Sequence, residues 1–441
     1  MKTEAVTILL ILILASQVAL CAPQSPQLKV SAEVSHPYLL CDRQQTAYLR
    51  IGLEGFIIDT QQEFRPPVNV SIVIDKSGSM NGDKIKQARR AAIGAIERLN
   101  SGDIVSVIAY DENVSVVVPA TKVSDKQTIY DKIRKIDAGG STALYSGVCK
   151  GADELRKFKE KNYINRMILL SDGLANVGPQ SADVLGSLGT ELITENISVT
   201  TVGLGLGYNE DLMSRLAFNS DGGHYFAEHA GDLAEVFDNE FGLATTVVAG
   251  QIEIRINCAD GIRPVRLFGR KGTIKGQDVV VNINQICQSQ EKYVILEVEA
   301  SPNTLKNQKQ LAGIDVLYDN MISKTNEKVA RSAYISFTES ESTVEKSVNS
   351  TVMVDVVEQI ANEQNELAMS MRDKGRVEEA RKLLETNSEY LAGNAKKYDS
   401  EKLYNDHKEN ANDAENLDQS SWTRQRKFMI FRQSTRKTQN N

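Results

Sequence analysis

Five hydroxyl and carboxyl side chains stand where strand-like runs give way to helical ones. Asp75, Ser77 and Ser79 form a D-x-S-x-S segment at the end of the apolar run VNVSIVID. Thr142 opens a helical pattern after a pair of glycines, and Asp172 closes the run RMILLSD. Because parallel strands end at one edge of their sheet, we expect these side chains to lie close together.

This donor set predicts a binding site for a hard divalent cation. Two carboxylates and three hydroxyls suit Mg²⁺, with Mn²⁺ or Ca²⁺ as alternatives, and do not suit Zn²⁺. Mg²⁺ takes six ligands, so five side chains, some acting through water, would leave a position for an incoming ligand. The alternative is that D-x-S-x-S is only a helix cap and turn, where Asp and Ser are favoured. Thr142 and Asp172 at matching strand ends favour the metal site.

The sequence lacks the residues that several other kinds of functional site require. The four His residues include no HExxH pair, and no GxxxxGK[ST] segment is present. The glycines at 203, 205 and 207 resemble a dinucleotide loop, but its third glycine position holds Tyr208. The D-x-S-x-S segment contains no His that would activate Ser77 as a nucleophile. We therefore expect no catalytic residues and a protein that is not an enzyme, and a hydrolase is the less favoured alternative.

The segments around these residues alternate between strand and helix patterns. Short apolar runs rich in β-branched residues, which suit strands covered on both faces, are separated by stretches with apolar residues at helical spacing. This alternation predicts an α/β fold over residues 67–246, with a doubly wound, mostly parallel, Rossmann-like sheet.

The two flanks of this region have strand patterns of their own. Residues 22–66 and 247–340 alternate apolar and polar positions, as half-buried strands do. The first flank is short for an independent core, so we expect both flanks to form one β-sandwich into which the α/β region is inserted. Residues 341–398 predict a C-terminal α-helical hairpin with Gly375 at its turn. Residues 399–441, first acidic and then basic, are expected to form a charged, solvated C-terminal tail.

The first 21 residues have the features of a secretory signal peptide. Lys2 precedes an apolar run, and small residues at 19 and 21 suit cleavage before Ala22. This predicts a secreted, periplasmic or cell-surface protein. An uncleaved membrane anchor is the first alternative, and a lipid-modified Cys21 is the second.

Four cysteines remain after residue 21, at Cys41, Cys149, Cys258 and Cys287. Their pairing is open, since four cysteines allow three connectivities. Cys258 and Cys287 both lie in strand-like sequence, so a disulfide between them is one hypothesis.

Composition limits the class of partner. The 441 residues suffice for two to four domains, and a net charge of −7 argues against nucleic acid as a partner. Contact with a membrane would require an uncleaved N-terminal segment or the basic end of the chain, where residues 423–437 hold six Lys or Arg and no acid.

The three loops resemble the metal-ion-dependent adhesion site of a von Willebrand factor type A domain, and the likeness covers about residues 68–245. It implies that Ser77, Ser79 and Thr142 bind the metal directly, whereas Asp75 and Asp172 act through water or hydrogen bonds. It further implies that an Asp or Glu of a protein partner completes the coordination. The whole chain resembles secreted bacterial proteins with such a domain and, more distantly, inter-alpha-trypsin inhibitor heavy chains.

The resemblance favours a secreted or envelope-associated protein that binds another protein, or adheres to a surface, through a cation. The alternative is a structural assembly subunit of a cell-envelope complex, in which the metal site fixes assembly and the helical end docks.

Overall fold

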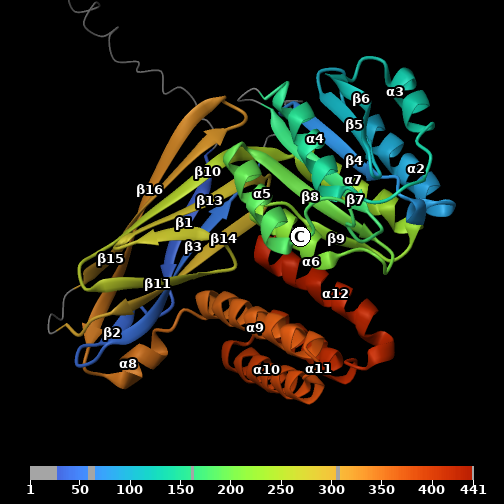
Figure 1. Ribbon diagram of the computed structural model, residues 1–441. Coiled ribbons are helices and arrows are strands. Elements are labelled where there is room, and N and C mark those ends of the chain that lie inside the picture. The colour runs from blue at the N-terminus through green and yellow to red at the C-terminus, as the bar shows by residue number, and fades with distance from the viewer. Residues whose placement is uncertain (1–26, 58–64, 160–162, 304–307, 440–441) are drawn as a thin grey trace, which may run out of the picture.

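The computed structural model describes residues 27–57, 65–159, 163–303 and 308–439. The predicted signal peptide at 1–21 lies outside these ranges, as do residues 22–26 of the first flank. The described chain has three parts: an α/β layer structure, a β-sandwich, and a group of C-terminal helices. In the view of Figure 1 these helices lie below the α/β part and beside the sandwich.

The α/β part is built on a six-stranded sheet with the order β6-β5-β4-β7-β8-β9. All neighbouring pairs are parallel except β5 and β6. The four central strands are buried along their whole length, which explains their continuous apolar, β-branched sequences. The strands are β4 (Val68–Asp75), β5 (Ile104–Tyr110), β6 (Val114–Lys122), β7 (Ile164–Ser171), β8 (Ile197–Leu204) and β9 (His224–Ala227).

Helices cover both faces of this sheet. One face packs on α2 (Asp83–Glu97), α3 (Lys126–Ile133) and α7 (Leu233–Thr245), through side chains such as Ile85, Ile129 and Phe237. The opposite face packs on α4 (Leu144–Arg156), α5 (Ala182–Thr194) and α6 (Glu210–Asn219). Two short 3-10 turns, η1 (Gly78–Met80) and η2 (Ala230–Asp232), precede α2 and α7. The predicted doubly wound, mostly parallel sheet is confirmed.

The flanks of the α/β part form two sheets with an apolar core between them. The first sheet has the order β1-β3-β14-β11 and the second β12-β13-β10-β15-β16-β2, so each contains strands from both flanks. This confirms that the α/β part is inserted into a sandwich. The strands are β1 (Lys29–Val34), β2 (Tyr38–Leu40), β3 (Gln45–Glu54), β10 (Val247–Cys258), β11 (Ile262–Phe268), β12 (Gly272–Lys275), β13 (Asp278–Cys287), β14 (Glu291–Ala300), β15 (Lys309–Asn320) and β16 (Thr325–Thr338).

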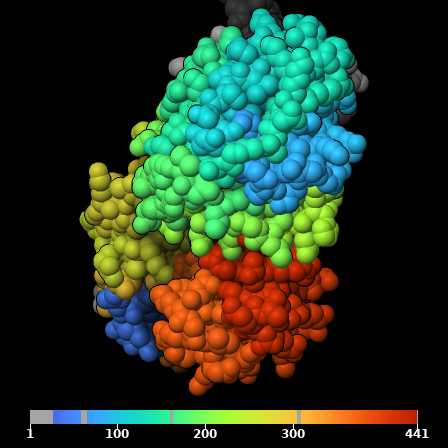
Figure 2. Space-filling model, turned by 45° about the vertical axis from the view of Figure 1, so that its right-hand side comes forward, coloured from blue at the N-terminus to red at the C-terminus, as the bar shows by residue number. Residues whose placement is uncertain are grey.

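The C-terminal region contains the expected hairpin and more. After α8 (Glu341–Lys346), α9 (Ser350–Asp373) and α10 (Val377–Tyr398) pack against each other, with Gly375 at a positive φ of 80° in the turn. The chain then continues into α11 (Glu401–Glu415) and α12 (Gln419–Thr438). Figure 2 shows these orange and red helices packed directly against the α/β part.

The expectation of a solvated tail over 399–441 is therefore wrong for the described residues. Trp422, Met429 and Ile430 of α12 are buried against α9 and α10. The cations of α12 are neutralised by acids of other elements, in the pairs Arg424–Glu228, Arg426–Asp211, Lys427–Glu210, Arg432–Asp413 and Arg436–Asp406. A basic segment is thus folded because tertiary partners supply the opposite charge.

The hypothesis of a Cys258–Cys287 disulfide is also wrong. On β10, Cys258 lies at one end, whereas Cys287 of β13 lies opposite Val247 at the other end. At about 3.4 Å per strand residue, this separation is several times the Cα distance that a disulfide allows. The four cysteines within the described residues have free thiols.

A buried charge cluster joins the α/β part to the sandwich. The Asp221 carboxylate accepts hydrogen bonds from Arg270 Nη1 (2.6 Å) and the Asn284 backbone N–H (2.8 Å), and Lys292 Nζ lies 3.3 Å away. Arg270 also donates to the Thr438 carbonyl at the end of α12 (2.8 Å). Burial acts to raise the pKa of Asp221, but the cations Lys292 and Arg270 hold it below its usual value.

We predict that Asp221→Asn lowers the free energy of unfolding by about 3 kcal/mol, because it leaves two buried cations without their counter-ion. Asp315→Asn, which alters an exposed ion pair with Lys328, should change it by less than about 1 kcal/mol. Denaturant titration of both variants measures the difference.

The same cluster predicts that the free energy of unfolding depends on pH. The folded pKa of Asp221 is depressed, so its stabilisation is present above the unfolded pKa of about 3.9 and is lost as the pH falls through the lower folded pKa. Equal stability of the Asp221→Asn and wild-type proteins at neutral pH would contradict this account.

Candidate metal site

Three loops at the carboxyl edge of the parallel sheet bring the predicted side chains together. Ser77 and Ser79 follow β4, Thr142 precedes α4, and Asp172 follows β7. The hydroxyls of Ser77 and Ser79 lie 3.1 Å apart, and Ser79 Oγ donates to Asp172 Oδ1 at 2.7 Å.

The hydroxyls of Ser77, Ser79 and Thr142 all face a small space next to Gly173. A Cβ at this glycine would lie 3.2 Å from Ser79 Oγ, 3.5 Å from Thr142 Oγ1 and 4.0 Å from Ser77 Oγ. Three hydroxyl oxygens from two separate loops therefore face one small space beside Asp172, which only the absence of a side chain at 173 leaves free.

Asp75 lies beneath this space and organises it. Its side chain is fully buried, with Oδ1 accepting from the Ser77 backbone N–H (2.8 Å) and Oδ2 from Ser171 Oγ (2.7 Å). Burial raises the pKa of the Asp75 carboxyl, although the hydrogen bonds from Ser77 and Ser171 act in the opposite direction. Asp75 thus ties the loop after β4 to the end of β7.

Backbone hydrogen bonds fix the loop that carries Thr142. Gly78 N–H donates to the Gly140 carbonyl (2.9 Å), and Gly139 N–H donates to the Lys76 carbonyl (2.7 Å). The Thr142 N–H donates to Asn176 Oδ1 at 2.7 Å, which connects this loop to the chain after β7. All five predicted residues therefore belong to one hydrogen-bonded assembly of three loops.

Lys84 on α2 is a member of the site that was not predicted from the sequence. Its Nζ lies 2.5 Å from Asp172 Oδ2, and Asp172 itself is almost fully buried. Nothing in the local sequence distinguishes Lys84 from neighbouring surface lysines such as Lys86. Ser171 and Gly173 flank Asp172 in the sequence but were given no role there, and Asn176 was not predicted, because the roles of all three depend on contacts between loops.

The residues fit a hard divalent cation. In the part of the chain that the structure describes, no three His, Cys, Asp or Glu side chains gather as a metal-binding group. Ligation would rest on hydroxyl oxygens together with Asp172, and the convergence around Gly173 provides that arrangement. Oxygen donors of this kind suit Mg²⁺, Mn²⁺ or Ca²⁺.

Comparison with known proteins identifies the class of domain to which this site belongs. Residues 69–239 match the family model of the von Willebrand factor type A domain. The α/β part of the chain is therefore a von Willebrand factor type A domain, hereafter the VWA domain.

Individual relatives match only part of their own length. The uncharacterized protein sll0103 of Synechocystis sp. is 26% identical over 266 residues, which is 58% of this chain and 62% of that protein. Human inter-alpha-trypsin inhibitor heavy chain H2 is 30% identical over 167 residues, which is 35% of this chain and 17% of that protein. The chain thus spans less than two thirds of either relative.

Two solved structures share the fold beyond the VWA domain. The von Willebrand factor type A protein from Catenulispora acidiphila superposes with a TM-score of 0.70 at 14% identity, over 89% of this chain and 91% of its own. The ArnB paralog VWA2 from Sulfolobus acidocaldarius gives a TM-score of 0.66 at 17% identity, over 93% and 98%.

We predict that Gly173→Ala weakens Mg²⁺ binding by at least about tenfold, because the new methyl group fills the space that the three hydroxyls face. Gly139→Ala is the matched control, since a Cβ there meets nothing within 4 Å. Isothermal titration calorimetry with MgCl₂ measures both. Wild-type affinity in Gly173→Ala would place the cation elsewhere.

Lys84→Met is predicted to strengthen Mg²⁺ binding, in contrast to Gly173→Ala. It keeps a long side chain but removes a positive charge from Asp172, so Mg²⁺ should bind about fivefold more tightly. Lys86→Met, on the exposed side of the same helix, should leave the affinity unchanged. An unchanged or weaker affinity in Lys84→Met would show that Lys84 does not compete with the cation.

Proposed function

We propose that this chain is a protein-binding, adhesion-type protein that holds a divalent cation at Asp75, Ser77, Ser79, Thr142 and Asp172. The observation that carries the proposal is the convergence of three hydroxyls and one carboxylate around Gly173. Mg²⁺ is the favoured cation, with Mn²⁺ or Ca²⁺ as alternatives.

The charge of the donor set supports a binding role. The hydroxyls of Ser77, Ser79 and Thr142 are neutral, so they would not cancel the charge of a cation that they hold. When bound, the cation would offer a position for a carboxylate oxygen from an Asp or Glu of the partner. Asp75 would keep the loops in place from beneath, and Asp172 would contribute negative charge beside the hydroxyls.

The surroundings of the serine hydroxyls favour binding over hydrolysis. Their side-chain partners are each other and Asp172, and no His contacts them among the described residues. His224 is buried against Thr201 and Tyr208, and burial lowers its pKa to about 3. We therefore propose a protein that is not an enzyme.

The alternative of an envelope-assembly subunit relies on a helical end that is free to dock. In the structure, α12 packs within the chain, against α6, β9 and α9. This arrangement favours the VWA domain, rather than the C-terminal helices, as the surface that meets a partner.

We also propose that the protein is exported, on the basis of the signal-like residues 1–21. None of the helices that the structure describes combines the length and the apolar composition needed to span a membrane. N-terminal sequencing of the protein from its native source tests export: a mature chain that begins at Ala22 is expected.

Loss of one hydroxyl should abolish capture of partners. We expect the immobilised wild-type chain to retain proteins from the native extracellular or envelope fraction in Mg²⁺ and to release them in EDTA. Ser79→Ala should retain none of them. Ser124→Ala, an exposed serine of the same domain, is the matched control and should behave as wild type. Retention that survives both EDTA and Ser79→Ala would refute the proposed function.

A further inference from the structure

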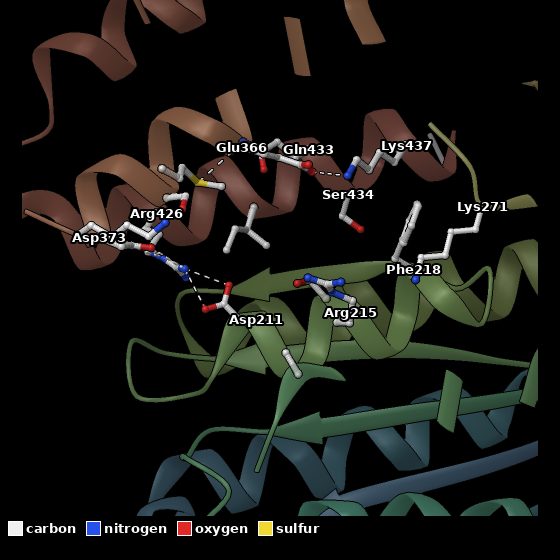
Figure 3. A pocket seen from close by; sticks show the side chains of 16 residues that line it. Asp211, Arg215, Phe218, Lys271, Glu366, Asp373, Arg426, Gln433, Ser434 and Lys437 are labelled. Carbon is white, nitrogen blue, oxygen red and sulfur yellow. Dashed lines mark hydrogen bonds and ion pairs between the residues drawn. The ribbon is translucent and has the colours of Figure 1, made fainter. Parts of the chain in front are cut away.

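A cavity of about 670 Å³ lies between the VWA domain and the C-terminal helices (Figure 3), and none of its lining residues belongs to the candidate metal site. Its walls come from α6 on one side and from α9 and α12 on the other, with Lys271 from the turn before β12 at one end. This volume is in the range of sites for small molecules.

The cavity has an excess of positive charge within an acidic protein. Its acidic side chains are already paired, because Asp211 and Asp373 bind Arg426 and Glu366 binds Lys437. Arg215 and Lys271, in contrast, form no ion pair within the described residues.

The unpaired cations lie near each other. Burial, followed by the charges of Arg215 and Lys437, lowers the pKa of Lys271. Arg215, Lys271 and Lys437 therefore face a common space with Glu366 and Asp183 as acids nearby, and an anion would relieve the repulsion among the three cations.

A buried hydroxyl also lacks a partner here. Ser434 of α12 is 7% exposed, and its Oγ has no hydrogen-bond partner among the described residues. Figure 3 shows this side chain extending from α12 toward Arg215 and Phe218 of α6. Because buried hydroxyls are nearly always hydrogen-bonded, the Ser434 hydroxyl is available to donate a hydrogen bond to a molecule in the cavity.

Part of the wall is apolar. Phe218, Met369 and Ile430 line the cavity, and Lys437 Nζ lies 5.1 Å from the centre of the Phe218 ring. A ligand that matches both parts of the wall carries an anionic group at one end and an apolar group at the other.

We propose that this cavity binds a small organic anion. Arg215, Lys271 and Lys437 would bind its phosphate or carboxylate group, and Ser434 would donate a hydrogen bond to it. The apolar part of the ligand would pack on Phe218 and Ile430. Because the walls belong to both the VWA domain and α12, the anion would stabilise their contact. This site is independent of the proposed cation-dependent function.

Isothermal titration calorimetry of the full chain with inorganic phosphate, phenyl phosphate and benzoate tests the proposal. The chain is first freed of divalent cations, and all titrations contain neither divalent cations nor EDTA, so no cation at the metal site contributes to anion binding and no chelator competes with the ligand. Phenyl phosphate or benzoate should bind with a dissociation constant below about 1 mM, and phenyl phosphate more tightly than inorganic phosphate. The organic anion that binds with the lower dissociation constant identifies the preferred head group as phosphate or carboxylate.

Two variants with equal charge loss locate the site. Arg215→Gln/Lys271→Met should weaken binding of the organic anion by about tenfold or more. Arg255→Gln/Lys328→Met, on the exposed sandwich surface, should leave it unchanged. Ser434→Ala should also weaken binding, and bound ligand should slow hydrogen exchange in 211–218 and 430–437.

The proposal is overturned if neither organic anion binds at about 10 mM, or if both double variants lose affinity equally. It is also overturned if Arg215→Gln/Lys271→Met binds as wild type while its circular dichroism spectrum is unchanged. A loss of affinity in Arg215→Gln/Lys271→Met alone, together with slower hydrogen exchange in α6 and α12 when ligand is bound, supports the proposal.

Discussion

The candidate metal site depends on one buried carboxylate, that of Asp75. A carboxylate that is removed from water requires hydrogen-bond donors, and here they come from the backbone of Ser77 and the hydroxyl of Ser171. Because these donors belong to the ends of two different strands, satisfying Asp75 also fixes the loops that carry Ser77, Ser79 and Asp172. The buried Asp75 carboxylate thus sets the positions of the side chains that would hold the cation.

The fold, and the residues that form the site, could be predicted because both follow from local sequence patterns. Continuous β-branched runs predict buried parallel strands, and parallel strands bring their carboxyl ends to one edge. Asp75, Thr142 and Asp172 were therefore expected together, and the structure brings them together. Lys84 could not be predicted in this way, because its contact with Asp172 depends on the position of α2 over that edge.

The end of the chain shows the opposite case. A run of Lys and Arg without acids is typical of a solvated tail. The same end of the chain also contains Trp422, Met429 and Ile430, which are buried in the structure. In the structure, the acids that neutralise α12 come from α6, from α11 and from the segment after β9. The bonds of Lys427 to the Tyr208 carbonyl and to Glu210 also connect α12 to the loop after β8. Gly207 in that loop lies against the Asp172 carbonyl, so the helix and the candidate metal site share a neighbour.

The central claim is that the hydroxyls and carboxylates of three loops hold one divalent cation. Diffraction from crystals grown with MnCl₂, measured at the manganese absorption edge, tests it most directly. The account predicts one anomalous peak within about 2.3 Å of the hydroxyl oxygens of Ser77, Ser79 and Thr142. A peak at another place in the chain, or no peak with ordered loops at 75–82, 139–143 and 171–176, would contradict it.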